Sequence, residues 1–159
     1  RGRSSNGRQK REERELFRLI YKSTSADPIR RETVRDILRT SAELNRENRI
    51  TGVLLATSTR FLQVIEGGFE EVNATFMRIA RDPRHRDIRL ISFGPAEDWL
   101  FEGWVMRGFG VFGENAELEA ELKQKYGEED GGVRFPERSW RALALVHDIR
   151  MVDNIPDLS

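Results

Sequence analysis

The fold is decided by residues 49–67, which read Arg-Ile-Thr-Gly-Val-Leu-Leu-Ala-Thr-Ser-Thr-Arg-Phe-Leu-Gln-Val-Ile-Glu-Gly. Two runs rich in branched and apolar residues, 50–56 and 61–66, are joined by the short polar segment 57–60. This pattern predicts a β-hairpin, although the loop contains neither Asn-Gly nor Asp-Gly. Because residues 53–56 are almost entirely apolar, we expect strands covered on both faces, as central strands are.

Gln63 is the unusual residue of this hairpin. Side chains alternate along a strand, so Phe61, Gln63 and Ile65 share a face, and the Gln63 amide points into an apolar layer. A buried amide without partners costs about 1–3 kcal/mol, so both of its ends need hydrogen bonds. Those bonds come either from groups inside the protein core or from a bound ligand.

The composition limits the class of protein. A chain of 159 residues is long enough for one domain with its own core. Its 27 basic and 27 acidic side chains cancel, so charge gives no reason to expect nucleic acid or an anionic membrane as a partner. No run approaches the roughly 20 apolar residues that span a bilayer, and no secretory signal is visible, so we expect a cytoplasmic protein.

The absence of cysteine removes several chemistries. Without cysteine there is no disulfide, iron–sulfur cluster, thiolate zinc site or thiol nucleophile. The two histidines, His85 and His147, lie far apart in the sequence, so we expect no metal site.

The first part of the chain predicts an arm, a strand and a helix. Residues 1–14 are polar and mostly basic, and we interpret them as a disordered arm or a remnant of protein expression. Residues 15–21 alternate as a strand does and end at Tyr21. A helix should then start near Pro28, with Ser25 or Asp27 as its cap, and run to about residue 48.

Two polar residues interrupt the inner face of this first helix. Ser41 and Asn45 lie at the spacing where apolar side chains are expected. Either the apolar stripe ends there and both residues are exposed, or they are buried polar groups that bind a ligand.

The elements that follow the hairpin define the fold class. Residues 69–80 form a second amphipathic helix that Pro83 ends, and residues 88–93 and 104–109 read as two further strands. The order β-α-β-β-α-β-β predicts an α+β fold, a ferredoxin-like sandwich with both helices on one face of the sheet. We assign this domain to residues 15–110.

Residues 111–159 predict a helical extension. Asn115 is a good cap for a helix over 116–126 that Gly127 ends, and residues 128–132 read as a linker. The second helix spans 137–151, and one side of it carries Trp140, Leu143, Ala144 and His147. We expect these two helices to cover the open face of the sheet or to form a contact surface, with His147 as a packing residue.

A set of residues in this order resembles the BLUF domains, which are flavin-binding sensors of blue light. The set consists of Tyr21, Asn45, Gln63 and the Trp-Val-Met of residues 104–106, with Ile-Thr-Gly at 50–52 and Phe-Leu-Gln-Val-Ile-Glu-Gly at 61–67. The turn Asp-Pro-Arg-His at 82–85 and the segment Phe-Glu-Gly-Trp at 101–104 also fit the family. The resemblance covers roughly residues 15–110.

The resemblance implies FAD as the cofactor, with its isoalloxazine ring between the two helices. Asn45 would pair with the carbonyl and imide edge of the ring, with Ser41 one turn away on the same helix face. Ile37 and Ile79 would sandwich the ring. Four residues would lie near the ribityl and phosphate end, although an exposed arginine at such a turn can equally be a solvated surface residue. They are Arg78, Asp82, Arg84 and His85.

The resemblance also implies a photoreceptor rather than an enzyme. Tyr21 would give an electron and then a proton to the excited flavin, and Gln63 would rotate or tautomerise and give a red-shifted signalling state. Trp104 and Met106 share a face of the predicted last strand, and only one of them can lie beside Gln63, so this strand would relay the signal.

The output would pass to a separate protein. The family suggests a cyclic-di-GMP phosphodiesterase or a transcriptional regulator, and exposed apolar residues on the last helix would favour a homo-oligomer. Two other functions stay open. One is a flavin- or nucleotide-binding module without photochemistry. The other is an RNA-binding module, but the central strands lack the exposed aromatic pattern that such a module needs.

Overall fold

The computed structural model describes residues 15–113 and 115–151, so the predicted arm at 1–14 lies outside the described residues. The elements are β1 (Leu16–Ser25), α2 (Arg31–Glu47), β2 (Thr51–Ala56), β3 (Arg60–Gly67), α3 (Phe69–Ala80), β4 (His85–Ala96), β5 (Arg107–Gly110), α4 (Ala116–Tyr126), β6 (Glu128–Glu129), β7 (Gly132–Val133) and α5 (Ser139–Arg150). No helix within these ranges combines the length and the apolarity needed to cross a membrane.

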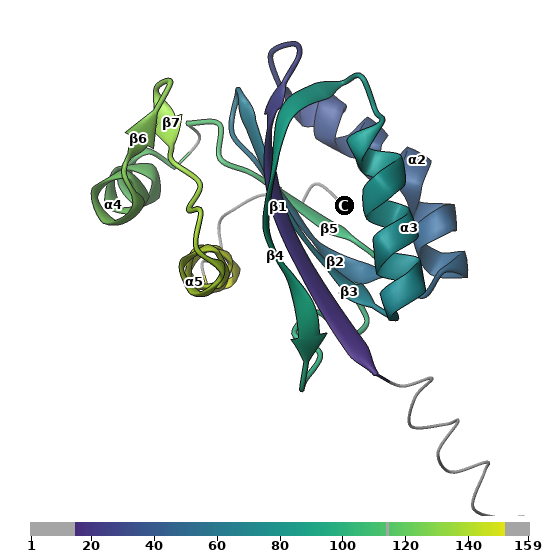
Figure 1. Cartoon of the computed structure of the whole chain (residues 1–159). Coiled ribbons are helices and arrows are strands. Elements are labelled where there is room, and N and C mark those ends of the chain that lie inside the picture. The colour runs from purple at the N-terminus through teal and green to yellow at the C-terminus, as the bar shows by residue number, and fades with distance from the viewer. Residues whose placement is uncertain (1–14, 114, 152–159) are drawn as a thin grey trace, which may run out of the picture.

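The main sheet has five strands in the order β4-β1-β3-β2-β5 (Figure 1). β1 pairs antiparallel with β3 and β4, β2 pairs antiparallel with β3, and β5 pairs parallel with β2. Figure 1 shows α2 and α3 together on one face of this sheet, with α4 and α5 on the other side. The predicted ferredoxin-like sandwich is confirmed.

The hairpin closes without the usual turn residues. The Thr57 amide donates to the carbonyl of Arg60 at 3.0 Å, and the Thr57 hydroxyl accepts from the Arg60 amide at 3.1 Å. These bonds replace the Asn-Gly signal that the sequence lacks. They fix the register that sets Leu54 opposite Gln63.

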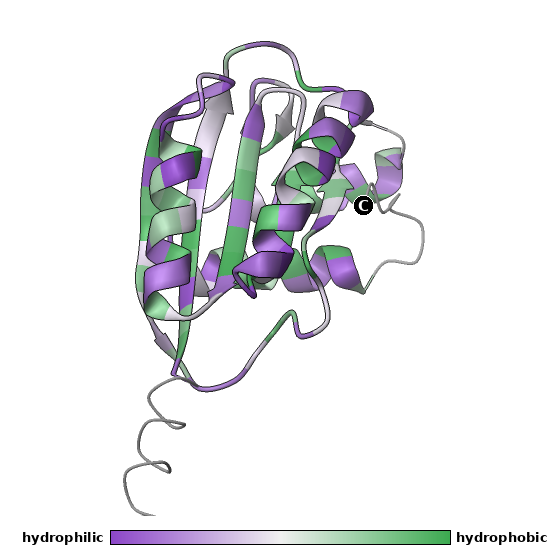
Figure 2. Ribbon diagram, turned by 90° about the vertical axis from the view of Figure 1, so that its right-hand side faces the viewer, coloured by the Kyte–Doolittle hydropathy of each residue, from purple (hydrophilic) through white to green (hydrophobic). Residues whose placement is uncertain are grey.

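The sheet carries a separate core on each face. Side chains that alternate along β2, such as Leu54 and Leu55, enter different cores, as the apolar run predicted. One core lies under α2 and α3, both of which show alternating hydrophilic and hydrophobic bands in Figure 2. The other core includes Leu122 of α4 with Leu145 and Ile149 of α5. The central strands β2 and β3 are therefore covered on both faces.

Several predicted boundaries were wrong. α2 begins at Arg31, because the hydroxyl of Ser25 donates to the carbonyl of Asp27 in a turn while Thr33 accepts from the amide of Arg30. β4 is longer than predicted, at both ends. β5 begins only at Arg107, so the preceding residues 104–106 are not part of a strand.

The helical extension also differs from its prediction. Asn115 caps α4 as expected, but residues 128–133 form the short β6–β7 hairpin instead of a linker. The buried stripe of α5 consists of Ala142, Leu145, Val146 and Ile149. Trp140 is 64% exposed and His147 is exposed, so the prediction of His147 as a packing residue was wrong, whereas Leu143 of the same side is partly buried against the core. The four buried residues form the aliphatic stripe that packs on the core, and Trp140 and His147 lie outside this stripe.

Candidate functional site

A cavity of about 270 Å³ lies between the sheet and the helices α2 and α3. This volume is close to the lower end of the range for small-molecule pockets, roughly 300–1,000 Å³. The cavity brings together residues that the sequence analysis chose from five elements and one turn. These are Tyr21, Ile37, Ser41, Asn45, Gln63, Arg78, Ile79, Asp82, Arg84 and His85.

Asn45 is the strongest sign that the cavity holds a ligand. Its side chain comes from α2 and is only 3% exposed. Within the described residues its amide has no hydrogen-bond partner, although a buried amide needs one at both ends. Ser41, one turn earlier, is half-buried and donates to the Ile37 carbonyl at 2.8 Å. Asn45 therefore presents an unpaired donor and acceptor to the cavity.

Tyr21 and Gln63 form a short side-chain hydrogen bond. They are direct partners in the antiparallel pairing of β1 with β3. The phenol of Tyr21 donates to Oε1 of Gln63 at 2.5 Å. Burial raises the pKa of Tyr21, and the negative charge of Asp82 raises this pKa further. The phenol therefore stays protonated and remains the donor.

The other end of the Gln63 amide faces Met106. Nε2 of Gln63 lies 3.5 Å from Sδ of Met106, which is a weak acceptor. Gly52 lets this segment approach, because a Cβ at Gly52 would overlap the Val64 carbonyl and crowd the Met106 methyl. Both ends of the amide are therefore occupied by side chains, not by the backbone of the core.

Trp104 does not belong to this cavity. It packs on the opposite core, with its ring 5.8 Å from Phe101 and 6.2 Å from Phe109. The guanidinium carbons of Arg107 and Arg150 lie 4.3 and 4.5 Å from the ring centroid. The sequence analysis expected either Trp104 or Met106 beside Gln63, and in the structure it is Met106.

The charged rim of the cavity comes from the end of α3 and the turn that follows. Arg84 donates to Asp82 at 2.9 and 3.0 Å through Nε, and this bond holds the pKa of the Asp82 carboxyl below its usual range. The charge of Arg84 is therefore largely balanced. Arg78 is exposed and forms no ion pair within the described residues. Arg78 is thus the cation left to contact an anionic group at this rim.

His85 of β4 forms hydrogen bonds to both β1 and α3. Its Nε2 lies 2.6 Å from the carbonyl of Ile79, which can only accept, so Nε2 carries a hydrogen. Its Nδ1 lies 2.8 Å from the hydroxyl of Ser23. Both ring nitrogens are used by protein groups, so a contact between His85 and a phosphate would have to break one of these bonds.

Four lining residues were not predicted: Thr40, Leu44, Leu54 and Phe61. Phe61 shares the strand face of Gln63, and this parity could have identified it. Leu54 lies opposite Gln63 in the hairpin register, which the sequence did not fix. Leu44 lies on the inner stripe of α2 beside Asn45, so helical spacing could have identified it, and Thr40 is the neighbour of Ser41 on the same helix.

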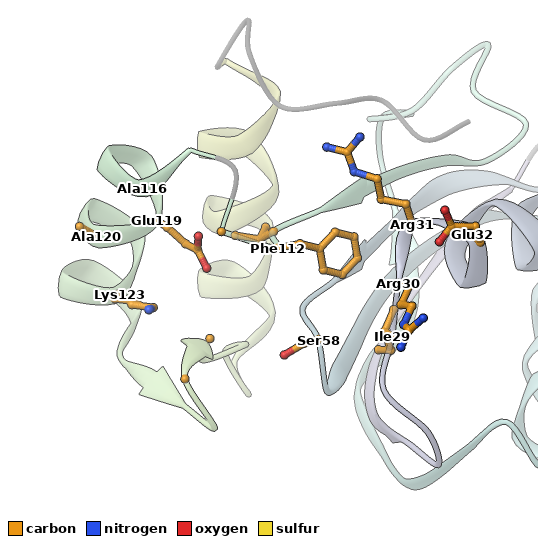
Figure 3. Close-up of a pocket in the computed structure, with 14 residues that line it drawn as sticks. Ile29, Arg30, Arg31, Glu32, Ser58, Phe112, Ala116, Glu119, Ala120 and Lys123 are labelled. Atoms are coloured by element: carbon orange, nitrogen blue, oxygen red, sulfur yellow. The ribbon is translucent and has the colours of Figure 1, made fainter.

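A larger cleft of about 750 Å³ lies between the N-terminal end of α2 and α4 (Figure 3). Its lining mixes Arg31 and Lys123 with Glu32 and Glu119, and Phe112 projects into it. It contains none of the predicted site residues. Within residues 15–113 and 115–151, no group of three or more histidines or acids is placed to hold a metal ion.

The fold and the cavity define a cofactor-binding α+β domain whose site combines apolar walls with a buried phenol and two buried amides. The chain belongs to the BLUF family: the model described as "Sensors of blue-light using FAD" matches residues 16–107. FAD is accordingly the cofactor of this domain.

Individual relatives agree with this membership. The chain is 33% identical over 97 residues to photoactivated adenylate cyclase subunit alpha of Euglena gracilis, which is 60% of this chain and 10% of that protein. The chain thus spans about a tenth of the length of the first curated relatives it matches.

Two solved structures resemble most of the chain. BlrB, a BLUF protein in its dark state, has a TM-score of 0.66 at 30% identity, over 85% of this chain and 95% of that one. BlsA in its ground state has a TM-score of 0.73 over 91% and 93% of the two chains. Its identity is 23%, so this second likeness shows the fold alone.

Proposed function

We propose that this domain senses blue light through the Tyr21–Gln63 pair beside FAD. The observation that carries the proposal is the 2.5 Å hydrogen bond between the Tyr21 phenol and Oε1 of Gln63 at the cavity wall. A short bond between a buried phenol and an amide is a ready path for a proton, and the amide is also in contact with a second, weaker partner.

The residues present fit the cofactor. Asn45 supplies an unpaired donor and acceptor that suit the carbonyl and imide edge of the ring. Ile37 of α2 and Ile79 of α3 supply apolar walls from two different helices. Arg78 at the rim suits a phosphate group, because its charge is not balanced by a carboxylate within the described part of the chain.

The photochemical step uses Tyr21 as the electron donor. When bound, FAD supplies a ring that becomes a one-electron oxidant after it absorbs blue light. The Tyr21 phenol would give one electron to the bound ring, become strongly acidic and pass its proton along the hydrogen bond to Oε1 of Gln63. The electron and the proton would then both return to Tyr21, so that no net redox change remains and Gln63 would be left rotated or tautomerised.

The rearranged Gln63 changes its partners. Rotation by half a turn would place Nε2 against the Tyr21 oxygen and Oε1 against Sδ of Met106. Oxygen and thioether sulfur are both acceptors, so the contact with Met106 loses its attraction and the methionine should move. The rearranged Gln63 amide would donate a new hydrogen bond to a carbonyl of the cofactor ring, and this bond would shift the absorption to the red.

The output is proposed to reach a separate protein. Met106 precedes β5, and β5 pairs with β2 at the edge of the sheet, so a shift of Met106 can be passed to that edge. A cyclic-di-GMP phosphodiesterase or a transcriptional regulator suits this role. The exposed Trp140 of α5 supports contact with another chain, including a second copy of this one.

The test is a light–dark absorption spectrum of the FAD-loaded protein. Gln63→Leu should bind FAD and lose the light-induced red shift, because leucine has neither a donor nor an acceptor. Tyr21→Phe should also bind FAD without forming the red-shifted state, because the electron donor is gone. Gln124→Leu, which alters an exposed glutamine of α4, should shift normally. A normal red shift in Gln63→Leu would remove the mechanism.

A further inference from the structure

A second large groove, which we call the cationic groove, lies on the face of the sheet that α5 covers. Its volume is about 820 Å³, and it runs between strands β1 and β4 and the segment that joins β7 to α5. Three carboxylates line it: Asp87, Glu129 and Glu137. Six cations line it: Lys22, Arg60, Arg89, Arg134, Arg138 and Arg141. The whole chain has no net charge, so the excess of positive charge is local.

Each of the three carboxylates of the groove pairs with a cation, and Asp87 does so with its neighbour Arg86 at 3.8 Å. Glu137 pairs with Lys22 at 2.9 Å and with Arg89 at 3.1 Å. Glu129 pairs with Arg60 at 3.0 Å and with a second arginine, Arg134, at 3.8 Å. These pairs use Lys22, Arg60, Arg89 and Arg134, and they leave Arg138 and Arg141 without a carboxylate partner in the described part of the chain.

Arg138 and Arg141 are the cations without a carboxylate in the described residues. Arg141 is held in place, because its guanidinium donates to the Lys125 carbonyl and lies 5.3 Å from the ring centroid of Tyr126. Arg138 precedes α5, is exposed and has no side-chain hydrogen bond within the described ranges. A fixed guanidinium beside a free one is suited to bind carboxylates.

The groove favours a protein ligand over a nucleotide. Its two aromatic residues, Tyr126 and Phe135, are 7% and 2% exposed, so neither offers a free ring on which a base could stack. Trp140 does not line the groove, but it is 64% exposed in the same first turn of α5 as Arg141. Arginine and tryptophan are the residue types that most often dominate protein–protein binding. We infer that the cationic groove binds an acidic segment of a partner protein.

The groove and the FAD cavity share strand β1. Lys22 and Ser23 line the groove, and Ser23 is bonded to Nδ1 of His85, which lines the cavity. Lys22 is the neighbour of Tyr21 in the sequence, and its side chain is 14% exposed. The inference deepens the proposed function by naming the chemistry of the partner, and any light dependence of binding rests on that function.

The test measures binding to the FAD-loaded chain in darkness. The probe is a fluorescein-labelled peptide of alternating glutamate and alanine, followed by fluorescence anisotropy. The peptide should bind, and more weakly as salt rises, because exposed charges are screened. Arg138→Gln combined with Arg141→Gln should weaken binding roughly two- to thirtyfold, as expected for two exposed ion pairs.

Matched variants separate the groove from general charge effects. Arg138→Glu reverses a charge without removing a structural contact, and it should weaken binding at least as much as the double variant. Arg39→Glu makes the same change on α2, where the side chain is 79% exposed, and should leave binding unchanged. Equal losses in both variants, or no binding by the unaltered chain, would overturn the inference. Tighter binding of inorganic triphosphate or of an RNA oligonucleotide would also overturn it.

The light-induced red shift is recorded on the same samples. A red shift without peptide binding removes the groove assignment and leaves the photoreceptor proposal intact. Peptide binding without a red shift supports the groove and removes the photochemical proposal.

Discussion

At the scale of single residues, the site depends on buried polar groups whose partners come from distant parts of the sequence. Tyr21 and Gln63 are 42 positions apart and meet only because β1 and β3 are neighbours in the sheet. The phenol is 3% exposed and the amide 7% exposed, so water replaces neither partner. Such a pair stays bonded in the dark state and holds one geometry.

The protonation of Tyr21 gives a prediction in alkaline solution. Burial raises the pKa of Tyr21 well above its ordinary value of 10.0, and burial with a hydrogen bond to Asp148 raises the pKa of Tyr126 to about 12. These are the only tyrosines of the chain. The folded protein should therefore show no tyrosinate absorbance near pH 10, whereas the denatured chain should titrate there.

The sign of the effect on stability follows from the same shifts. A folded-state pKa above the unfolded value means that the native state keeps a proton that the unfolded state loses. The contribution of the neutral phenols to stability is complete below pH 10 and falls as the pH rises toward the folded pKa values. A tyrosine that ionises near pH 10 while the circular dichroism stays native would contradict this account.

At the scale of elements, the segment between β4 and β5 connects the site to the rest of the sheet. It carries Met106 to Gln63 on one face and places Trp104 in the opposite core. The amide of Gly52 donates to the Trp104 carbonyl at 3.1 Å, which continues the pairing toward β2 before β5 begins. A movement of Met106 should therefore shift side chains in both cores.

Met106→Ala tests this connection. The variant should keep most of the light-induced red shift, because Tyr21 and Gln63 are unchanged, but the signal should no longer reach β5. Hydrogen exchange of residues 104–110, compared in light and darkness, should change less than in the unaltered protein. Met106→Leu keeps the volume at a cost below about 1.5 kcal/mol and should behave similarly, because it removes the sulfur acceptor. Met77→Ala, at a 49% exposed position of α3, is the control.

Glu66 anchors the same segment from β3. Its carboxylate is fully buried and accepts from Arg18 at 2.8 Å, from the Leu100 amide at 3.0 Å and from the Phe101 amide at 2.9 Å. Three donors from two other parts of the chain thus converge on one charge. The carboxylate therefore holds the start of the segment between β4 and β5 against the central strand β3.

Removal of this carboxylate should be costly. Glu66→Ala leaves Arg18 and two backbone amides without their acceptor, and we expect the free energy of unfolding to fall by about 3–5 kcal/mol. Urea denaturation measures the change. Asp36→Ala, whose side chain is 66% exposed and 3.9 Å from Arg39, should alter the unfolding midpoint little. Similar unfolding midpoints for Glu66→Ala and Asp36→Ala would show that the Glu66 carboxylate does not contribute to the free energy of unfolding.

At the scale of the whole molecule, one sheet serves two cores. The core under α2 and α3 contains the cavity, and the core under α4 and α5 closes the other face of the same strands. Ile20 enters the second core, while its neighbours Leu19 and Tyr21 enter the first. The helical extension therefore contributes to the stability of the strands that hold the site.

Leu145→Ala tests this contribution. Leu145 of α5 is fully buried against the sheet, and its truncation should lower the free energy of unfolding by about 2–5 kcal/mol. Leu90→Ala removes the same group from a 52% exposed position on β4 and should cost much less. If unfolding followed by FAD fluorescence and by circular dichroism showed separate transitions, the extension would be independent of the light-sensing core.

Local patterns in the sequence determined the hairpin, the α+β class and the two amphipathic helices, because alternation and helical spacing fix which side chains share a face. Most of the cavity residues followed instead from the resemblance to the BLUF family. The sequence left open whether Asn45 is buried and whether Trp104 or Met106 contacts Gln63, and the stripe that it favoured on α5 is not the buried one. In each case the question is which of two faces of one element becomes buried. The packing of the other elements determines this, because burial and hydrogen bonding are properties of the assembled chain.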